Sequence, residues 1–251
     1  MREAIEAANT NAKVDRCKAG SATERDVIRF DLGNRFVQGK KAKTIVLGSQ
    51  LPAITDSSGL RINGQKAKIT ISGNEQVRVF EVRVGAELVL LNLTVADGRS
   101  STNSGGGLLT EQGTVKVTNS TFSENSVSSD GGGIYNERGT ATLRNTIVAY
   151  SPSGGNCAGA ITDGGYNIDD ATSCGFTEQQ DSLPSTDPLL ADQPAFNGGP
   201  TKTIALLKGS PAINAIPKGE NGCTTEIKTD QRGVSRPQGS GWEMGAFEKK
   251  Q

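Results

Sequence analysis

A near-duplication in the middle of the chain constrains the fold more than any other feature. Residues 105–119 read GGGLLTEQGTVKVTN and residues 131–145 read GGGIYNERGTATLRN, so the same pattern returns after 26 residues. A less exact copy precedes them, and its Asn92 aligns with Asn119 and Asn145 at spacings of 27 and 26 residues. A period of this length is typical of solenoids, in which each repeat packs only on its neighbours.

The repeats are built from short strands rather than helices. Aliphatic residues alternate with polar ones, as at Val115 and Val117, which is the period of a strand with one buried face. The return segment at 123–133 reads SENSVSSDGGG, and its glycines and serines would not form the helical return of a leucine-rich repeat. Strands of successive repeats would then stack about 4.8 Å apart as parallel sheets. We therefore predict an all-β fold, a single parallel β-helix over residues 1–251.

Both ends of the chain depart from the repeat. Exposed ends of a solenoid need caps, and MREAIEAAN at the start predicts a short amphipathic helix within an N-terminal cap at 1–30. The coils are expected at 31–182, with a loop excursion at 151–182. Proline turns replace the repeat afterwards, so residues 183–251 are predicted to form irregular last coils and a C-terminal cap.

The asparagine column has a structural interpretation. Asparagine tolerates the left-handed backbone better than most residues, and its amide both donates and accepts hydrogen bonds. We therefore predict that Asn92, Asn119 and Asn145 form a ladder of stacked side chains. Asn92-Leu-Thr and Asn119-Ser-Thr also match the N-glycosylation sequon, but their place in the periodic column favours the structural role.

The composition excludes several functions. Lys+Arg and Asp+Glu both total 27, so the formal net charge is zero. The chain therefore lacks the positive charge that would indicate a nucleic-acid partner. No apolar run approaches the ~18 residues of a membrane span, so we expect no membrane insertion. The chain has no histidine, which removes the commonest general base and imidazole metal ligands. We expect a monomer without an obligatory cofactor.

Four cysteines stand at positions 17, 157, 174 and 223. Cys157 and Cys174 flank a loop-rich stretch, and we predict that a disulfide joins them, which implies an oxidising compartment. A straight stack would keep Cys17 away from Cys223, and the pairing of both stays open. Without histidines or a CxxC spacing, a zinc site is not expected.

Few carboxylates suggest a catalytic or metal site. Asp169 and Asp170 are adjacent, but successive strand residues point to opposite faces unless a turn reorients them. A solvated turn is the favoured interpretation. Asp97, Glu124 and Asp130 lie in turns and could bind Ca²⁺. Their spacings of 27 and 6 residues are not in step with the columns, however. We assign no catalytic residue and no metal ligand.

Aromatic side chains that could stack on sugar rings are scarce. Tyr135, Tyr150 and Tyr166 are the candidates for glycan contact, together with Trp242. Packing at strand ends is the favoured alternative for these side chains.

Several stretches resemble a known family. They are MREAIEAANTN at the start, DVIRFDLG at 26–33, LPAITD at 51–56, NGGPTKTIALLKGSPAINA at 197–215, DQRGVSRPQG at 230–239 and MGAFE at 244–248. The chain resembles the bacterial CSLREA and choice-of-anchor Q domain proteins. The resemblance implies a right-handed, pectate-lyase-like β-helix outside the cytoplasm. Members normally carry a signal peptide and an anchor, and neither is recognisable here. Members also carry a cysteine before the opening stretch and often one where Trp242 stands, which leaves partners for Cys17 and Cys223 in doubt.

Two functions remain open. The first is a non-catalytic extracellular or cell-surface module, adhesin-like or structural, whose partner would be a polysaccharide or a cell-surface glycan. The alternative is a carbohydrate-active enzyme, a polysaccharide lyase or glycoside hydrolase, because the scaffold hosts both. The absence of histidine and of a convergent acidic cluster favours the first. The excursion at 151–182, where the repeat fails, is the first place to look for a site.

Overall fold

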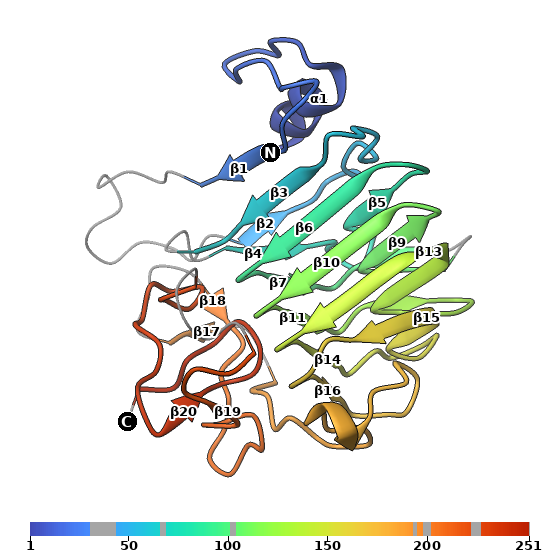
Figure 1. Cartoon of the computed structure of the whole chain (residues 1–251). Helices are drawn as coiled ribbons and strands as arrows, with labels where there is room; N and C mark the ends of the chain where they lie inside the picture. The colour runs from blue at the N-terminus through green and yellow to red at the C-terminus, as the bar shows by residue number, and fades with distance from the viewer. Residues whose placement is uncertain are drawn as a thin grey trace.

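Short aliphatic strands separated by glycine- and asparagine-rich turns form a β-solenoid of about four turns (Figure 1). The computed structural model describes residues 1–30, 44–65, 69–100, 104–192, 195–197, 202–221 and 227–250. The predicted all-β parallel architecture is confirmed. One helix, α1 (Arg2–Thr10), precedes the strands at the N-terminal end.

The strands form three parallel stacks, one on each side of the solenoid. The first contains β5 (Phe80–Val82), β9 (Leu108–Glu111) and the first half of β13 (Ile134–Arg144). The second contains β1 (Asp26–Arg29), β3 (Leu60–Asn63), β6 (Glu87–Leu91), β10 (Thr114–Thr118) and the second half of β13. The third contains β2 (Thr44–Val46), β4 (Thr70–Ser72), β7 (Thr94–Ala96), β11 (Thr121–Ser123), β14 (Ile147–Ala149) and β16 (Ile168–Asp169).

Shorter elements complete the chain. Strand β15 (Cys157–Asp163) pairs along most of β13 and thereby extends the first two stacks. Two-residue strands pair as β8 (Arg99–Ser100) with β12 (Ser126–Val127), β17 (Ala195–Phe196) with β18 (Lys202–Thr203), and β19 (Ile216–Pro217) with β20 (Gly241–Trp242). A single 3₁₀ turn, η2 (Glu178–Gln180), follows β16.

The duplicated stretch forms two successive coils in the predicted register. Leu108 pairs with Ile134 in the first stack, and Val117 pairs with Leu143 in the second. All four side chains are buried at or below 1% exposure. The aliphatic columns that define the repeat are therefore the core of the solenoid.

The glycine triplets of the repeat bring neighbouring coils into close contact. A Cβ atom on Gly107 would lie 2.5 Å from the carbonyl oxygen of Gly133, and one on Gly133 would lie 2.6 Å from that of Asn156. Real Cβ atoms do not approach backbone so closely, so any side chain here would push two coils apart. The first glycine of each triplet, Gly105 and Gly131, has φ of 76° and 68°, where other residues are strained.

We expect Gly107→Ala to lower the free energy of unfolding by about 1–3 kcal/mol, because overpacking must displace hydrogen-bonded backbone. Gly48→Ala is the matched control, since a Cβ at Gly48 meets no atom within 4 Å. Its effect should stay within about 0.5 kcal/mol. Guanidinium titration followed by far-UV circular dichroism measures both, and equal effects would contradict the packing argument.

The three asparagines occupy one left-handed corner. Asn92, Asn119 and Asn145 have φ of 52°, 48° and 52° and follow paired strands in equivalent positions. No hydrogen bond joins their amides, since the side-chain atoms of Asn92 and Asn119 have no partner in the described chain. Asn145 instead exchanges two hydrogen bonds with Asn221 of the C-terminal segment. Burial of Asn92 and Asn119 makes both sequons inaccessible in the folded protein.

Helix α1 covers the N-terminal end of the stack. Ile5 and Ala8 join the same apolar cluster as the strand residues Leu60 and Ile62. Asn11 ends the helix in the left-handed conformation, with φ of 50°. The amphipathic helix predicted from the opening residues is therefore present and caps the stack.

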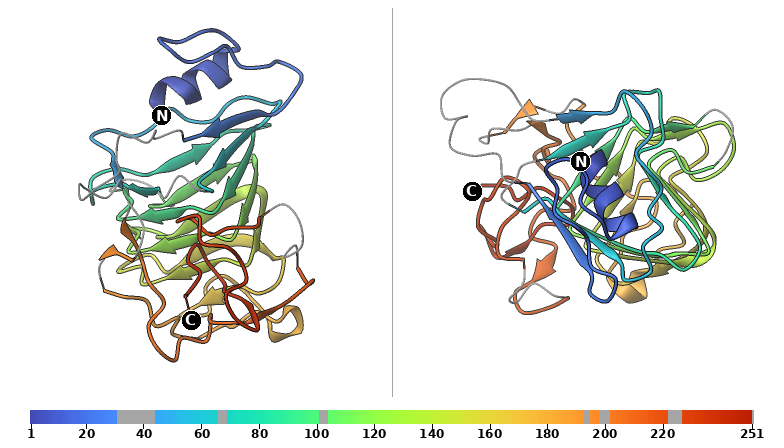
Figure 2. Two further views of the ribbon diagram at one scale, coloured as in Figure 1. Left: turned by 90° about the vertical axis from the view of Figure 1, so that its left-hand side faces the viewer. Right: turned by 90° about the horizontal axis from the view of Figure 1, so that it is seen from above.

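The C-terminal segment lies along one side of the solenoid. Figure 2 shows it beside the strands, against the outer face of the third stack. The side-chain amide of Gln231 donates to the carbonyl of Ile69 at 2.7 Å, and its oxygen accepts from Thr94 Oγ1 at 2.6 Å. The backbone N–H of Ala246 donates to Thr121 Oγ1 at 3.1 Å. We expected residues 183–251 to form irregular last coils and a cap. The described part also covers a lateral face.

Candidate functional site

An acidic column runs along the corner that follows the third stack. Strands β7, β11 and β14 end in register, and the next residues are Asp97, Glu124 and Tyr150. All three have left-handed backbone, with φ of 52°, 56° and 59°. The sequence argument that these carboxylates are out of step was wrong for Asp97 and Glu124, because their spacing of 27 residues equals one coil. Only Asp130 lies off the column.

A polar groove of about 550 Å³ opens beside this column. The short strands β8 and β12 form part of its wall, because Arg99 and Ser126 line it. Side chains that could bind a ligand include Glu75, Asp97, Arg99, Glu124, Ser126 and Ser153. The groove therefore offers three carboxylates, one guanidinium and two hydroxyls.

Repulsion among carboxylates sets the electrostatics of the groove. Partial burial raises the pKa of Glu124, and Asp97, Asp170, Asp192 and Glu75 raise it further by their negative charge. Asp97 is held in place, since Ser72 Oγ donates to its Oδ2 at 2.8 Å. This arrangement disfavours anionic ligands and suits neutral or cationic ones.

The three tyrosines lie in different places. Tyr150 continues the acidic column; its hydroxyl donates to Asp187 Oδ1 at 2.5 Å, and burial followed by this hydrogen bond raises its pKa to about 12. Tyr166 is only 8% exposed, its hydroxyl donates to Glu220 Oε2 at 2.7 Å, and burial raises its pKa. Tyr135 is half-buried on β13 of the first stack. The structure does not bring them together, and a stacking role stays a prediction for Tyr135.

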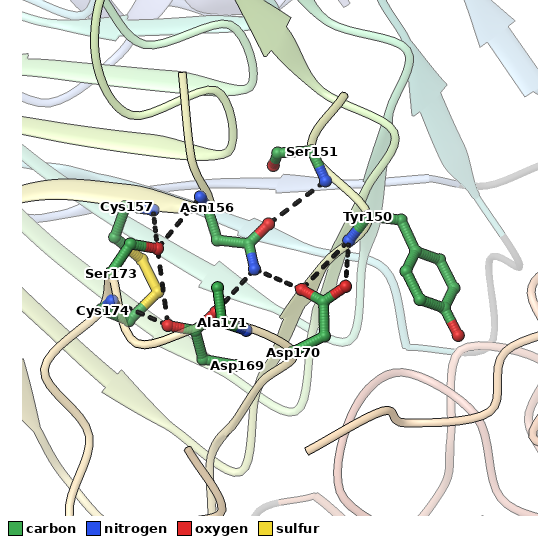
Figure 3. Close-up of a disulfide and its surroundings, with 9 residues drawn as sticks. All are labelled: Tyr150, Ser151, Asn156, Cys157, Asp169, Asp170, Ala171, Ser173 and Cys174. Carbon is green, nitrogen blue, oxygen red and sulfur yellow. Dashed lines mark hydrogen bonds between the residues drawn. A yellow bond between two sulfur atoms is a disulfide. The ribbon is translucent and has the colours of Figure 1, made fainter. Parts of the chain in front are cut away.

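Asp169 occupies an unusual position for a carboxylate. It pairs with Val148 in the inward-facing column of the third stack and is fully buried. Its oxygens accept hydrogen bonds from Asn156 Nδ2 at 2.6 Å and from the N–H groups of Ala171 and Cys174 at 2.9 and 2.8 Å (Figure 3). The expectation of a solvated turn was wrong, because these donors replace water.

Asp170 reaches the same amide as its neighbour. Asn156 Nδ2 donates to Asp170 Oδ1 at 2.5 Å, and the N–H of Tyr150 donates to Asp170 Oδ2 at 3.2 Å. The turn therefore reorients Asp170, as the sequence left open, and the two carboxyl groups do not point to opposite faces. Strand β16 ends at Asp169, and the chain turns there. Both carboxylates are hydrogen-bonded to donors of the surrounding loop.

The stretch at 151–182, predicted as a loop excursion, instead continues the stack, because β15 pairs with β13 and β16 with β14, and it closes the C-terminal end. The predicted disulfide between Cys157 and Cys174 is confirmed. Both cysteines and Phe176 belong to the main apolar cluster, so the loop covers the last coil. Cys17 is free and half-buried, whereas Cys223 lies outside the described residues. The disulfide indicates an oxidising compartment.

Metal binding gains no support from the geometry. Within the described ranges, no three or more histidine, cysteine, aspartate or glutamate side chains are grouped as metal ligands. A calcium ion at the acidic corner stays a hypothesis from the sequence.

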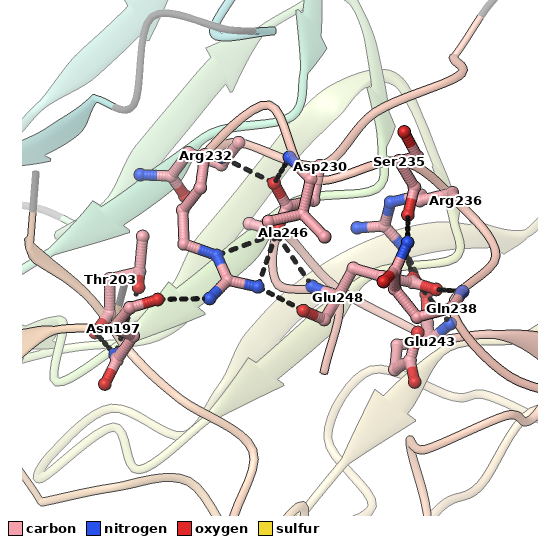
Figure 4. Close-up of polar contacts among 12 residues, drawn as sticks. Asn197, Thr203, Asp230, Arg232, Ser235, Arg236, Gln238, Glu243, Ala246 and Glu248 are labelled. Carbon is pink, nitrogen blue, oxygen red and sulfur yellow. Dashed lines mark hydrogen bonds and ion pairs between the residues drawn. The ribbon is translucent and has the colours of Figure 1, made fainter. Parts of the chain in front are cut away.

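Sequence reasoning missed a buried polar cluster in the C-terminal segment (Figure 4). Arg232 pairs with Asp230 at 2.8 Å, and Arg236 pairs with Glu248 at 3.2 Å. Glu243 is also buried beside them. The only signal was the density of charged residues in a stretch without repeats.

The comparisons leave the family unassigned. No protein-family model, curated protein or solved structure matches the chain. Among the described helices, none is long and apolar enough to cross a membrane. The fold and the groove define the chain as a parallel β-solenoid with an acidic corner groove.

Proposed function

We propose that the protein is a non-catalytic, extracytoplasmic β-solenoid module that binds a glycan in its acidic corner groove. The observation that carries the proposal is the polar lining of the groove on a stack whose other columns serve packing. Carboxylates and hydroxyls from neighbouring coils can each hydrogen-bond a sugar hydroxyl. The disulfide and the family resemblance support a location outside the cytoplasm, including display on a cell surface.

Charge narrows the class of glycan. Three carboxylates line the groove against one guanidinium, and two further aspartates raise the pKa of Glu124. This negative charge would repel a polyuronate, whereas it would not repel neutral or amino sugars. The negative charge of the groove also disfavours a polysaccharide lyase, because its uronate substrate is anionic.

A glycoside hydrolase is the second candidate. Hydrolysis needs one carboxylic acid with a raised pKa and one ionised carboxylate. Glu124 has the raised pKa and Asp97 stands one coil away in the same column. Turnover distinguishes this candidate from simple binding.

We expect the double variant Asp97→Asn, Glu124→Gln to lose at least about tenfold in glycan affinity, since charge-assisted hydrogen bonds contribute about 1.5–3 kcal/mol each. A glycan array containing neutral, amino-sugar and uronate chains identifies the ligand, and calorimetry measures the loss. Glu137→Gln is the control, because Glu137 is on β13 of the first stack and pairs with Arg138.

The outcomes separate the hypotheses. Unchanged affinity in the double variant would remove the groove as the site. Release of reducing ends by the wild type, but not by Glu124→Gln, would replace the binding module with a hydrolase. Preference for polyuronates would contradict the charge argument.

A further inference from the structure

The C-terminal segment buries two glutamate side chains beside a single arginine. Glu243 and Glu248 are both fully buried, and Arg236 is the guanidinium beside them. Arg236 Nη1 bonds Glu248 Oε2 at 3.2 Å, and its remaining hydrogen bonds go to the carbonyl oxygens of Glu243 and Gly245, both at 2.7 Å. Arg236 therefore hydrogen-bonds the carboxylate of Glu248 and not that of Glu243.

The two carboxyl groups differ in their donors. Glu248 also accepts from the N–H groups of Gln238 at 2.8 Å and Glu243 at 3.3 Å. Neither side-chain oxygen of Glu243 accepts a hydrogen bond from the described chain. A buried carboxylate without donors is strongly unfavourable, so this group is stable only as the neutral acid.

The pKa agrees with this geometry. Burial and the negative charge of the neighbouring Glu248 raise the pKa of Glu243 to about 9. Arg236 acts in the opposite direction but does not cancel them. At neutral pH the Glu243 carboxyl is therefore protonated, whereas an exposed glutamate would be ionised.

Glu243 stands where the segment meets the solenoid. Its neighbours Trp242 and Met244 belong to an apolar cluster that also contains Ile147 and Ile168 of the third stack. The contacts that Gln231, Gly245 and Ala246 make with the stack are uncharged; they involve Ile69, Thr94, Thr121 and Asn145. Elsewhere the segment's Glu220 and Asp187 carboxylates accept from the hydroxyls of Tyr166 and Tyr150.

No charged solenoid group takes part in those contacts within the described chain. The other charged residues of the cluster, Asp230 and Arg232, pair with each other. Arg236 is therefore the one cation among these described groups beside an ionised Glu243, and its hydrogen bond to a carboxylate goes to Glu248.

We propose that Glu243 is a pH-sensitive latch, which holds the C-terminal segment on the third stack while its carboxyl is protonated and releases it on ionisation. The docked segment retains a proton that the released segment loses. Docking is therefore strongest below the ordinary glutamate pKa of 4.5 and weakens as the pH rises toward about 9. Each increase of one pH unit in this window lowers the equilibrium constant for docking by up to about tenfold.

Trp242 is a built-in reporter of this step. It is the only tryptophan of the chain, it is 4% exposed, and it precedes Glu243. Titration of the wild type from pH 6 to 10 should shift its fluorescence to longer wavelength and increase acrylamide quenching as the pH rises toward about 9, with no further change above that pH. The far-UV circular dichroism of the strands should persist. Glu243→Gln should keep the tryptophan shielded throughout, and the control Glu137→Gln should behave like the wild type.

Three results would overturn the latch. They are a tryptophan that stays shielded in the wild type up to pH 10, a Glu243→Gln variant that opens at the wild-type pH, and loss of the strand signal together with the fluorescence change. The wild-type titration decides the question even where Glu243→Gln does not fold.

Discussion

Replacement of Phe122 by alanine is expected to lower the free energy of unfolding by about 3–5 kcal/mol. Phe122 is fully buried in the inward column of the third stack, between Val95 and Val148 of the adjoining coils. Its backbone is paired on both sides, so the coils cannot collapse into the space that the ring leaves. Guanidinium titration followed by circular dichroism measures the loss.

Val46→Ala provides the matched comparison. Val46 belongs to the same stack but is 57% exposed. Its truncation should change the free energy of unfolding by no more than about 0.5 kcal/mol. A loss below about 1 kcal/mol for Phe122→Ala would mean that the neighbouring coils move into the cavity, so the stack would not be rigid.

The repeat made the central coils predictable from sequence. Alternating aliphatic residues specify which side chains face inward, and glycines specify where coils touch. The pairing of Leu108 with Ile134 follows from these two signals and is confirmed. The bond between Cys157 and Cys174 was also predictable, because the two cysteines flank a turn-rich stretch of the sequence.

Contacts without periodicity could not be predicted in this way. Gln231 bonds a backbone oxygen 162 residues away, and no pattern in either stretch indicates that pair. Asp169 stands at an inward position that every earlier coil fills with an aliphatic or aromatic residue. Only the donors of the folded loop explain it. The acidic column was missed because Asp130 was compared with Asp97 and Glu124, although only the latter two share a register.

The disulfide of the end cap gives the second large effect. We expect Cys157→Ser with Cys174→Ser to lower the free energy of unfolding by about 3 kcal/mol, since the bond joins residues 17 positions apart. Thermal and guanidinium unfolding of the double variant measure the loss. Cys17→Ser is the control, because Cys17 is a free cysteine near the N-terminal end of the solenoid. Its replacement should have little effect.

The loss should begin at the C-terminal end, because Asp169 depends on the same loop. The N–H of Cys174 donates to Asp169, and Ser173 Oγ accepts from the N–H groups of Asn156 and Cys157. Without the covalent bond these contacts open together, and water then reaches a carboxylate in the core column. In a solenoid each coil is stabilised mainly by its neighbours. Hydrogen exchange at constant pH should therefore increase first in β16 and β15 of the double variant, and only later in β10. Uniform acceleration along all coils would instead show that the disulfide acts on the stack as a whole.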